Sequence, residues 1–77
     1  MRRLLALLLL LLPLPVTADD FSDAVAAYAD ADYEKAYQLW RPLAESGDAG
    51  AMFDLGALYW EGQGIPRNRP LAIEWWQ

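Results

Sequence analysis

Two residue types that carry much of protein chemistry are missing from this sequence, which has no cysteine and no histidine. Disulfides are therefore excluded, and so is a lipid-modified cysteine at an export cleavage point. The usual zinc and transition-metal ligands are absent, as are the Cys–His and Ser–His–Asp groups of nucleophilic catalysis. We predict a non-catalytic chain without metal or cofactor, stabilised by helix packing, a partner or further chain.

Basic residues are also scarce. After residue 18 the chain holds four basic residues against eleven acidic ones, which is a formal charge of −7. A surface that binds nucleic acid needs clustered lysine and arginine to neutralise phosphates, so we do not expect a nucleic-acid partner. An acidic balance instead favours solubility and cationic partners.

Residues 1–18 have the pattern of a secretory signal peptide. Arg2 and Arg3 supply a positive start, Leu4–Leu12 is an unbroken apolar run, and small residues precede a cleavage point after Ala18. The run is far shorter than the roughly 20 residues that span a bilayer, although an uncleaved anchor is the alternative. We predict a mature protein that is periplasmic or secreted and meets the membrane only through its signal peptide.

The rest of the chain predicts only helices, since no alternating run rich in valine, isoleucine and threonine suggests a strand. Apolar side chains at helical spacing recur in four segments, about 21–29, 33–46, 49–61 and 69–77. Asp32, Asp48 and Asn68 are the expected N-caps of the last three. Gly47 is expected in a left-handed conformation, and Pro42 predicts a local kink. The expectation is an all-α chain of two antiparallel helix pairs.

The two pairs are related by an internal repeat. The segment Ala36–Trp40 aligns with Ala72–Trp76 at an offset of 36, whereas Tyr28 aligns with Tyr59 at an offset of 31. The difference is one insertion, the glycine-containing loop 61–65. These offsets bracket the roughly 34-residue period of tetratricopeptide helix–turn–helix units.

The segment 51–65 resembles the Sel-one-like repeat, a member of the tetratricopeptide-like superfamily with the pattern A-x-x-x-L-G-x-x-Y-x-x-G-x-G-V. The matching residues, with those of the usual continuation A-x-x-W, are Ala51, Leu55, Gly56, Tyr59, Gly62, Gly64, Ala72 and Trp75. Ile65 replaces the valine, and Asn68 and Leu71 replace an acid and a lysine. The resemblance implies an α-solenoid with a tetratricopeptide-like first repeat at 19–47 and a Sel-one-like second repeat at 48–77, after the signal peptide predicted at 1–18.

Specific packing roles follow for these residues. Gly56 is expected to face a partner helix whose backbone a Cβ would hold away, and Gly62 and Gly64 to allow positive φ. Among the aromatic residues we expect these to be core: Tyr28, Tyr33, Tyr37, Trp40, Tyr59 and Trp75. Trp60 lies off the apolar face of its helix and is the candidate for an exposed protein contact.

Trp75 and Trp76 have nothing downstream to pack on, which predicts an N-terminal fragment; a dimerising mini-protein is the alternative.

The resemblance implies a module for protein–protein interaction, a scaffold or adaptor that holds a protein or peptide between stacked helices. The alternative is an accessory protein of cell-envelope polysaccharide or peptidoglycan metabolism. A hydrolase is a distant third hypothesis, since the paired acids Asp30 and Asp32 fall in a turn where capping is usual. The acids also lack the spacing of a calcium loop.

Overall fold

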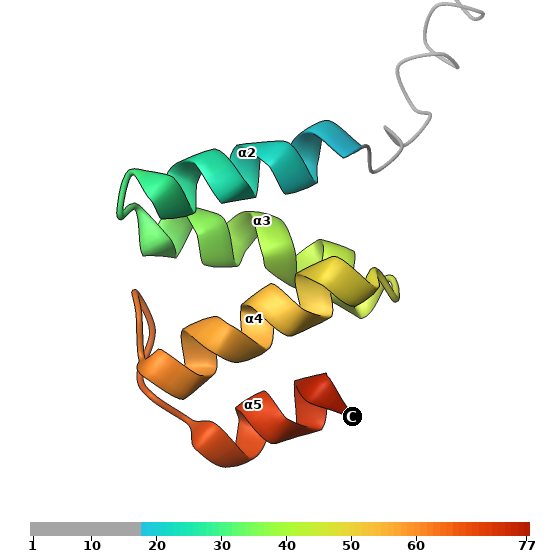
Figure 1. Ribbon diagram of the computed structural model, residues 1–77, viewed down its shortest axis with the longest axis vertical. Helices are drawn as coiled ribbons and strands as arrows, with labels where there is room; N and C mark the ends of the chain where they lie inside the picture. Colours follow the sequence, from blue (N-terminus) through green and yellow to red (C-terminus); the bar gives the residue numbers. More distant parts are fainter. Residues whose placement is uncertain (1–17) are drawn as a thin grey trace, which may run out of the picture.

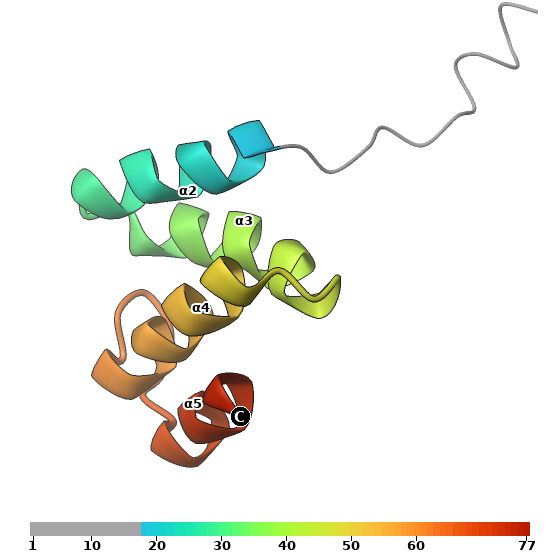
Figure 2. The same cartoon turned by 45° about the vertical axis from the view of Figure 1, so that its right-hand side comes forward.

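The computed structural model describes residues 18–77, which form four α-helices and no strand (Figure 1). They are α2 (Ala18–Ala29), α3 (Tyr33–Glu45), α4 (Ala49–Glu61) and α5 (Arg69–Trp76). Each helix runs antiparallel to the previous one and packs on it, so that two hairpins follow each other along the chain (Figure 2). The predicted all-α helical-repeat architecture is confirmed. Apart from Ala18, the predicted signal peptide lies outside the described residues, and its cleavage stays a prediction.

Three helices begin at the N-caps expected from the sequence. The carboxylate of Asp32 accepts a hydrogen bond from the backbone N–H of Lys35 at 3.3 Å, and that of Asp48 accepts from Ala51 at 2.9 Å. The side-chain carbonyl of Asn68 accepts from the Leu71 N–H at 3.1 Å, so the amide makes the capping bond in place of an acid. Each bond satisfies a backbone donor that has no partner within its own helix.

The turns between helices also follow the sequence. Gly62 ends α4 in the left-handed region at φ 70°, and its N–H donates to the carbonyl of Leu58. Gly47 has φ 97° between α3 and α4, as expected. Pro42 lies inside α3, which continues through it to Glu45, and the predicted kink stays a prediction. Among residues 18–77, no helix combines the length and apolar character needed to cross a membrane.

The core consists of alanines where helices approach closely and of larger side chains between them. Ala24, Ala36, Ala51 and Ala72 are completely buried. The other buried side chains are Ala27, Trp40, Leu43, Ala44, Leu55 and Leu58. Small residues let two helix backbones approach, and the leucines and Trp40 fill the space that remains.

The aromatic residues are less buried than the sequence suggested. Only Trp40 is buried, with 3% of its surface exposed, and Tyr28 is 40% exposed, so its assignment to the core is wrong. The remaining four are half-buried and pack against the core: Tyr33, Tyr37, Tyr59 and Trp75. Two helical hairpins enclose few interior positions, and a tyrosine hydroxyl is best placed where it meets water or a polar partner.

Gly56 faces the partner helix α5, as predicted, but the group it meets there is a side chain. A Cβ at this position would lie 2.3 Å from Nε1 of Trp76, so the glycine makes room for an indole ring and not for a helix backbone. The indole N–H of Trp76 donates to the carbonyl of Phe53 at 3.0 Å. Trp76 thus packs back on α4, and Trp75 is half-buried against the core. Both tryptophans therefore pack on residues that precede them in the chain.

Candidate functional site

Most of the large apolar side chains that remain exposed lie together. Five are exposed in the described part of the chain, and four of these line two neighbouring hollows. We call these four the apolar strip: Val25 and Tyr28 of α2, Phe53 of α4 and Trp76 of α5. The fifth, Ile73, lies outside it. Contiguous exposed apolar surface is typical of interaction sites, which makes the strip the candidate functional site.

The two hollows meet at Phe53. The first, of about 300 Å³, is lined by Val25, Tyr28, Trp40, Phe53, Asp54 and Ala57, and we call it the α2–α4 hollow. The second, of about 620 Å³, is lined by Ala49, Met52, Phe53, Trp75, Trp76 and Gln77, and we call it the α4–α5 hollow. Because Phe53 borders both, a segment lying across the strip could contact both helical hairpins.

Phe53 is the most exposed large apolar residue of the strip, at 64%. On α4, which turns about 100° per residue, it lies opposite the buried face of Ala51, Leu55 and Leu58. Its ring contacts Trp76, with centroids 6.0 Å apart, but it supports no part of the core. Phe53 was not among the residues predicted to contact a partner, because α4 is apolar on nearly all sides.

The wall of the α2–α4 hollow on the α2 side is held in place by aromatic contacts. The Tyr28 ring lies 5.8 Å from that of Trp40 and 5.2 Å from that of Tyr33, edge to face in the second case. The Tyr28 hydroxyl donates to the side-chain carbonyl of Gln63 at 3.3 Å. Tyr28 is thus exposed yet fixed, which limits the conformational entropy that a ligand would remove.

Asp54 is the single charged residue that lines the α2–α4 hollow. Partial burial, and to a smaller extent the charge of Asp48, raise the pKa of Asp54. Within residues 18–77 its carboxylate has no hydrogen-bond or ion-pair partner, whereas Asp48 caps α4. The hollow therefore combines apolar walls with one incompletely solvated negative charge.

Trp60, the predicted exposed contact, is half-buried. The guanidinium of Arg69 lies 4.6 Å from the centre of its ring, and the ring of Trp76 lies 5.5 Å away. Arg69 also donates from Nε to the backbone carbonyl of Trp60 at 3.3 Å. Trp60 adjoins the strip through Trp76, but Arg69 and Trp76 take up much of its surface. A role for Trp60 in partner contact stays a prediction.

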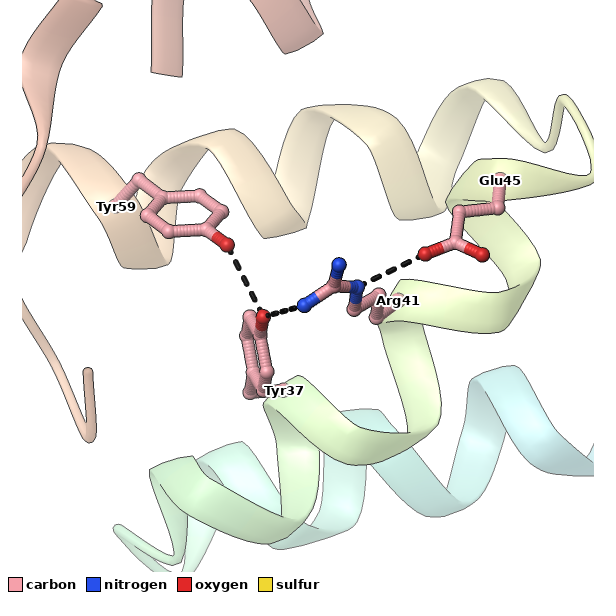
Figure 3. A network of polar contacts seen from close by, with 4 residues as sticks. All are labelled: Tyr37, Arg41, Glu45 and Tyr59. Carbon is pink, nitrogen blue, oxygen red and sulfur yellow. Dashed lines mark hydrogen bonds and ion pairs between the residues drawn. The ribbon is translucent and has the colours of Figure 1, made fainter. Parts of the chain in front are cut away.

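A polar network joins the two hairpins on another part of the surface (Figure 3). The hydroxyls of Tyr37 on α3 and Tyr59 on α4 share a hydrogen bond of 3.0 Å. Arg41 donates to the Tyr37 hydroxyl, and its Nε donates to the Glu45 carboxylate at 2.8 Å. Burial, followed by the hydrogen bond to Tyr37, raises the pKa of Tyr59 to about 12.

The glycine loop of the second hairpin also contacts the first. Gly64 has φ 73°, and a Cβ there would lie 2.8 Å from both the Tyr33 Cβ and the Glu34 backbone nitrogen. The neighbouring Gln63 accepts the hydrogen bond from Tyr28. The loop therefore helps to set how α4 lies against α2 and α3, and with it the shape of the α2–α4 hollow.

Comparison with known families agrees with this arrangement. A family model described as Sel1 repeat matches residues 26–48 and 49–77, which together make up more than half of the chain. The chain belongs to the Sel1 repeat family. Neither a search of curated proteins nor a search of solved structures gives a match. Sel1 repeats are helical hairpins that generally mediate protein–protein interaction and are typically non-catalytic.

The positions of the Sel1 pattern build the hairpin. Four are buried, Tyr59 and Trp75 are half-buried, and both loop glycines have positive φ; the buried ones are Ala51, Leu55, Gly56 and Ala72. Phe53, Asp54 and Ala57, by contrast, occupy positions that the pattern leaves variable. The lining of the α2–α4 hollow on α4 thus comes from variable positions, whereas the α4–α5 hollow also includes Trp75 of the pattern.

Asp30 and Asp32 lie between α2 and α3. Asp32, one of the paired acids weighed for hydrolysis, uses its carboxylate to cap α3. In the part of the chain that the structure describes, no three carboxylates are close enough together to hold a metal ion. The strip and the two hollows beside it offer aromatic rings, aliphatic side chains and the carboxylate of Asp54, which can recognise a ligand by shape and charge.

The raised pKa of Tyr59 predicts a loss of stability at high pH. Because the folded protein holds this proton up to about pH 12 and an unfolded tyrosine only up to about pH 10, the contribution is complete below pH 10 and disappears between about 10 and 12. Urea midpoints measured from pH 8 to 11.5 should fall more steeply for the natural protein than for Tyr59→Phe. Titrating groups that do not contact Tyr59 are common to both proteins and cancel in the difference. Parallel curves would contradict the assignment.

Proposed function

We propose that this protein is an exported, non-catalytic Sel1 scaffold or adaptor whose apolar strip binds an extended segment of a partner protein. The observation that carries the proposal is the continuity of the strip across both hairpins, with Phe53, 64% exposed, between the two hollows. The signal-peptide pattern of residues 1–18 supports export.

The chemistry of the strip favours a protein segment as the ligand. Aromatic residues such as tryptophan and tyrosine dominate the energetics of protein interfaces, because they offer large contact areas for few rotatable bonds. Two hollows of about 300 and 620 Å³ suit successive side chains of one segment. Both have mainly apolar linings, which favour apolar side chains and the aliphatic stems of long polar ones.

Replacing Phe53 with serine tests the proposal. The bait that captures the partner is protein made from the full 77-residue sequence and recovered from the exported fraction. The intact mass of this protein also tests cleavage after Ala18. We expect Phe53→Ser to weaken capture of the partner at least about 30-fold, the loss of an interface residue worth roughly 2 kcal/mol. Far-ultraviolet circular dichroism should stay unchanged, since Phe53 is outside the core.

Ile73→Ser is the matched control. Ile73 is also a large apolar side chain, 45% exposed, but it lies outside the strip. Its replacement should leave capture within a factor of about two of the natural protein. Equal capture by the natural protein and Phe53→Ser would sink the proposal. Recovery of glycan without protein would instead favour the accessory role in the cell envelope.

A further inference from the structure

The α2–α4 hollow holds a negative charge that no cation of the described chain neutralises. Residues 18–77 contain four basic side chains, and none of them lines this hollow. Arg41 is bound to Glu45 and Tyr37, and Arg69 lies over Trp60. Asp54 is half-buried among apolar groups, and its carboxylate has no hydrogen-bond or ion-pair partner in this part of the chain. A ligand that fills the hollow would remove still more water from the carboxylate.

Desolvation decides what kind of side chain can enter. Covering a carboxylate without providing a hydrogen bond or an opposite charge is unfavourable. A purely apolar side chain in the hollow would cover the Asp54 carboxylate without providing either. An acidic side chain would add electrostatic repulsion with Asp54. A cationic side chain would instead form a charge-assisted hydrogen bond, the strongest kind available to a protein. The raised pKa of Asp54 supports this reasoning, because burial is its main cause.

The walls of the hollow also suit a long cationic side chain. Val25 and Ala57 offer aliphatic surface to the methylene groups of a lysine or arginine. Phe53 and Tyr28 are 64% and 40% exposed, and their rings can attract a cation by cation–π interaction. The formal charge of −7 after residue 18 further attracts a basic segment during encounter.

We propose that the α2–α4 hollow is a specificity pocket for a lysine or arginine side chain of the bound segment, paired with Asp54 and flanked by Tyr28 and Phe53. The inference rests on the proposed function and names the chemistry of its ligand. Because Phe53 also borders the α4–α5 hollow, the matching partner segment carries a basic residue followed or preceded closely by an apolar one.

The test uses a phage-displayed library of random 12-residue peptides, selected on the natural protein and on two variants. Asp54→Asn removes the charge of the hollow, and Asp30→Asn removes one charge from the turn after α2 as the matched control. Peptides selected on the natural protein should be enriched in lysine or arginine beside an apolar residue. Synthetic copies should bind Asp54→Asn at least about tenfold more weakly and Asp30→Asn within about twofold.

Stability measurements separate binding from folding. Since burial disfavours the ionised form of Asp54, Asp54→Asn should have the same or a higher thermal midpoint, so weaker binding could not come from unfolding. Selection repeated on Asp54→Asn should lose the enrichment in basic residues. A fall in midpoint for this variant would count against the inference.

Three further outcomes distinguish the two proposals. If selected peptides need Phe53 but are not enriched in basic residues and bind Asp54→Asn equally well, the cationic pocket is wrong and the binding function stands. If the library yields no Phe53-dependent peptide, both fail. If sedimentation shows the chain dimerising through the strip, with Asp54→Asn dimerising equally, a second copy is the occupant and the cationic pocket is overturned.

Discussion

Trp40→Ala should leave the protein without a cooperative unfolding transition at 25 °C. Trp40 is the largest side chain of the core, 3% exposed, and it contacts the rings of Phe21 and Tyr28 at 6.3 and 5.8 Å. Replacing a buried tryptophan with alanine costs about 3–5 kcal/mol. A domain of about 60 residues has only about 3–9 kcal/mol of stability in total, so most of the folded population is lost. Far-ultraviolet circular dichroism during urea titration would show a shallow, non-cooperative curve.

Trp40→Phe tests how much of the stability depends on the size of the Trp40 ring and not on its indole N–H. Within the described chain the indole N–H of Trp40 has no acceptor, so phenylalanine removes no hydrogen bond. Its smaller ring leaves a cavity but keeps aromatic contact with Phe21 and Tyr28, and we expect a cooperative transition with a lower midpoint. A Trp40→Ala protein that unfolds at the natural urea midpoint would show that Trp40 contributes little to the core.

The features that could be predicted from the sequence are those decided within a few residues. Asp32, Asp48 and Asn68 each accept a hydrogen bond from the backbone three positions later. Gly47 and Gly62 end helices at positive φ because glycine alone adopts this conformation without strain. Such interactions do not depend on what packs against the far side of the helix. Spacing and residue type are therefore enough to predict them.

The candidate site could not be predicted in the same way. Nearly every residue of α4 is apolar, and a helix that is apolar all round does not reveal which face is buried. Phe53 is exposed because α2, α3 and α5 leave that side of α4 open, which depends on the packing of the whole chain. The packing of Trp76 could not be predicted for the same reason, since only the fold places its ring over Gly56.

The hollow and the repeat are connected through the contacts between hairpins. Tyr37 and Tyr59 join α3 to α4, and the loop at Gln63 and Gly64 contacts α2 and α3. The distance between Tyr28 on α2 and Phe53 on α4 therefore depends on how the second hairpin sits against the first. Tyr59 and Gly64 of the Sel1 pattern thus help to set the shape of the α2–α4 hollow, whose α4 side is formed by variable positions.

Gly64→Ala should be among the most damaging single substitutions in the loop, for stability and for binding. Alanine at φ 73° is strained by about 1–2 kcal/mol. Its Cβ would also lie 2.8 Å from the Glu34 backbone nitrogen, which cannot move aside as a flexible side chain could, and such overpacking costs about 1–3 kcal/mol more. Displacing the loop would also disturb the hydrogen bond from Tyr28 to Gln63 and so alter the α2–α4 hollow.

Gly47→Ala provides the control, because it changes the same residue type at positive φ but without a clash. Gly47 has φ 97°, and nothing lies within 4 Å of where its Cβ would be. Urea denaturation should therefore show a loss of about 1–2 kcal/mol from strain alone, and partner capture under folding conditions should be unchanged. Gly64→Ala should lose more stability than this and should weaken capture even where it remains folded. Equal losses of stability and of capture in Gly64→Ala and Gly47→Ala would mean that Gly64 matters only for the conformation of its own turn. The contact between hairpins would then not shape the binding surface.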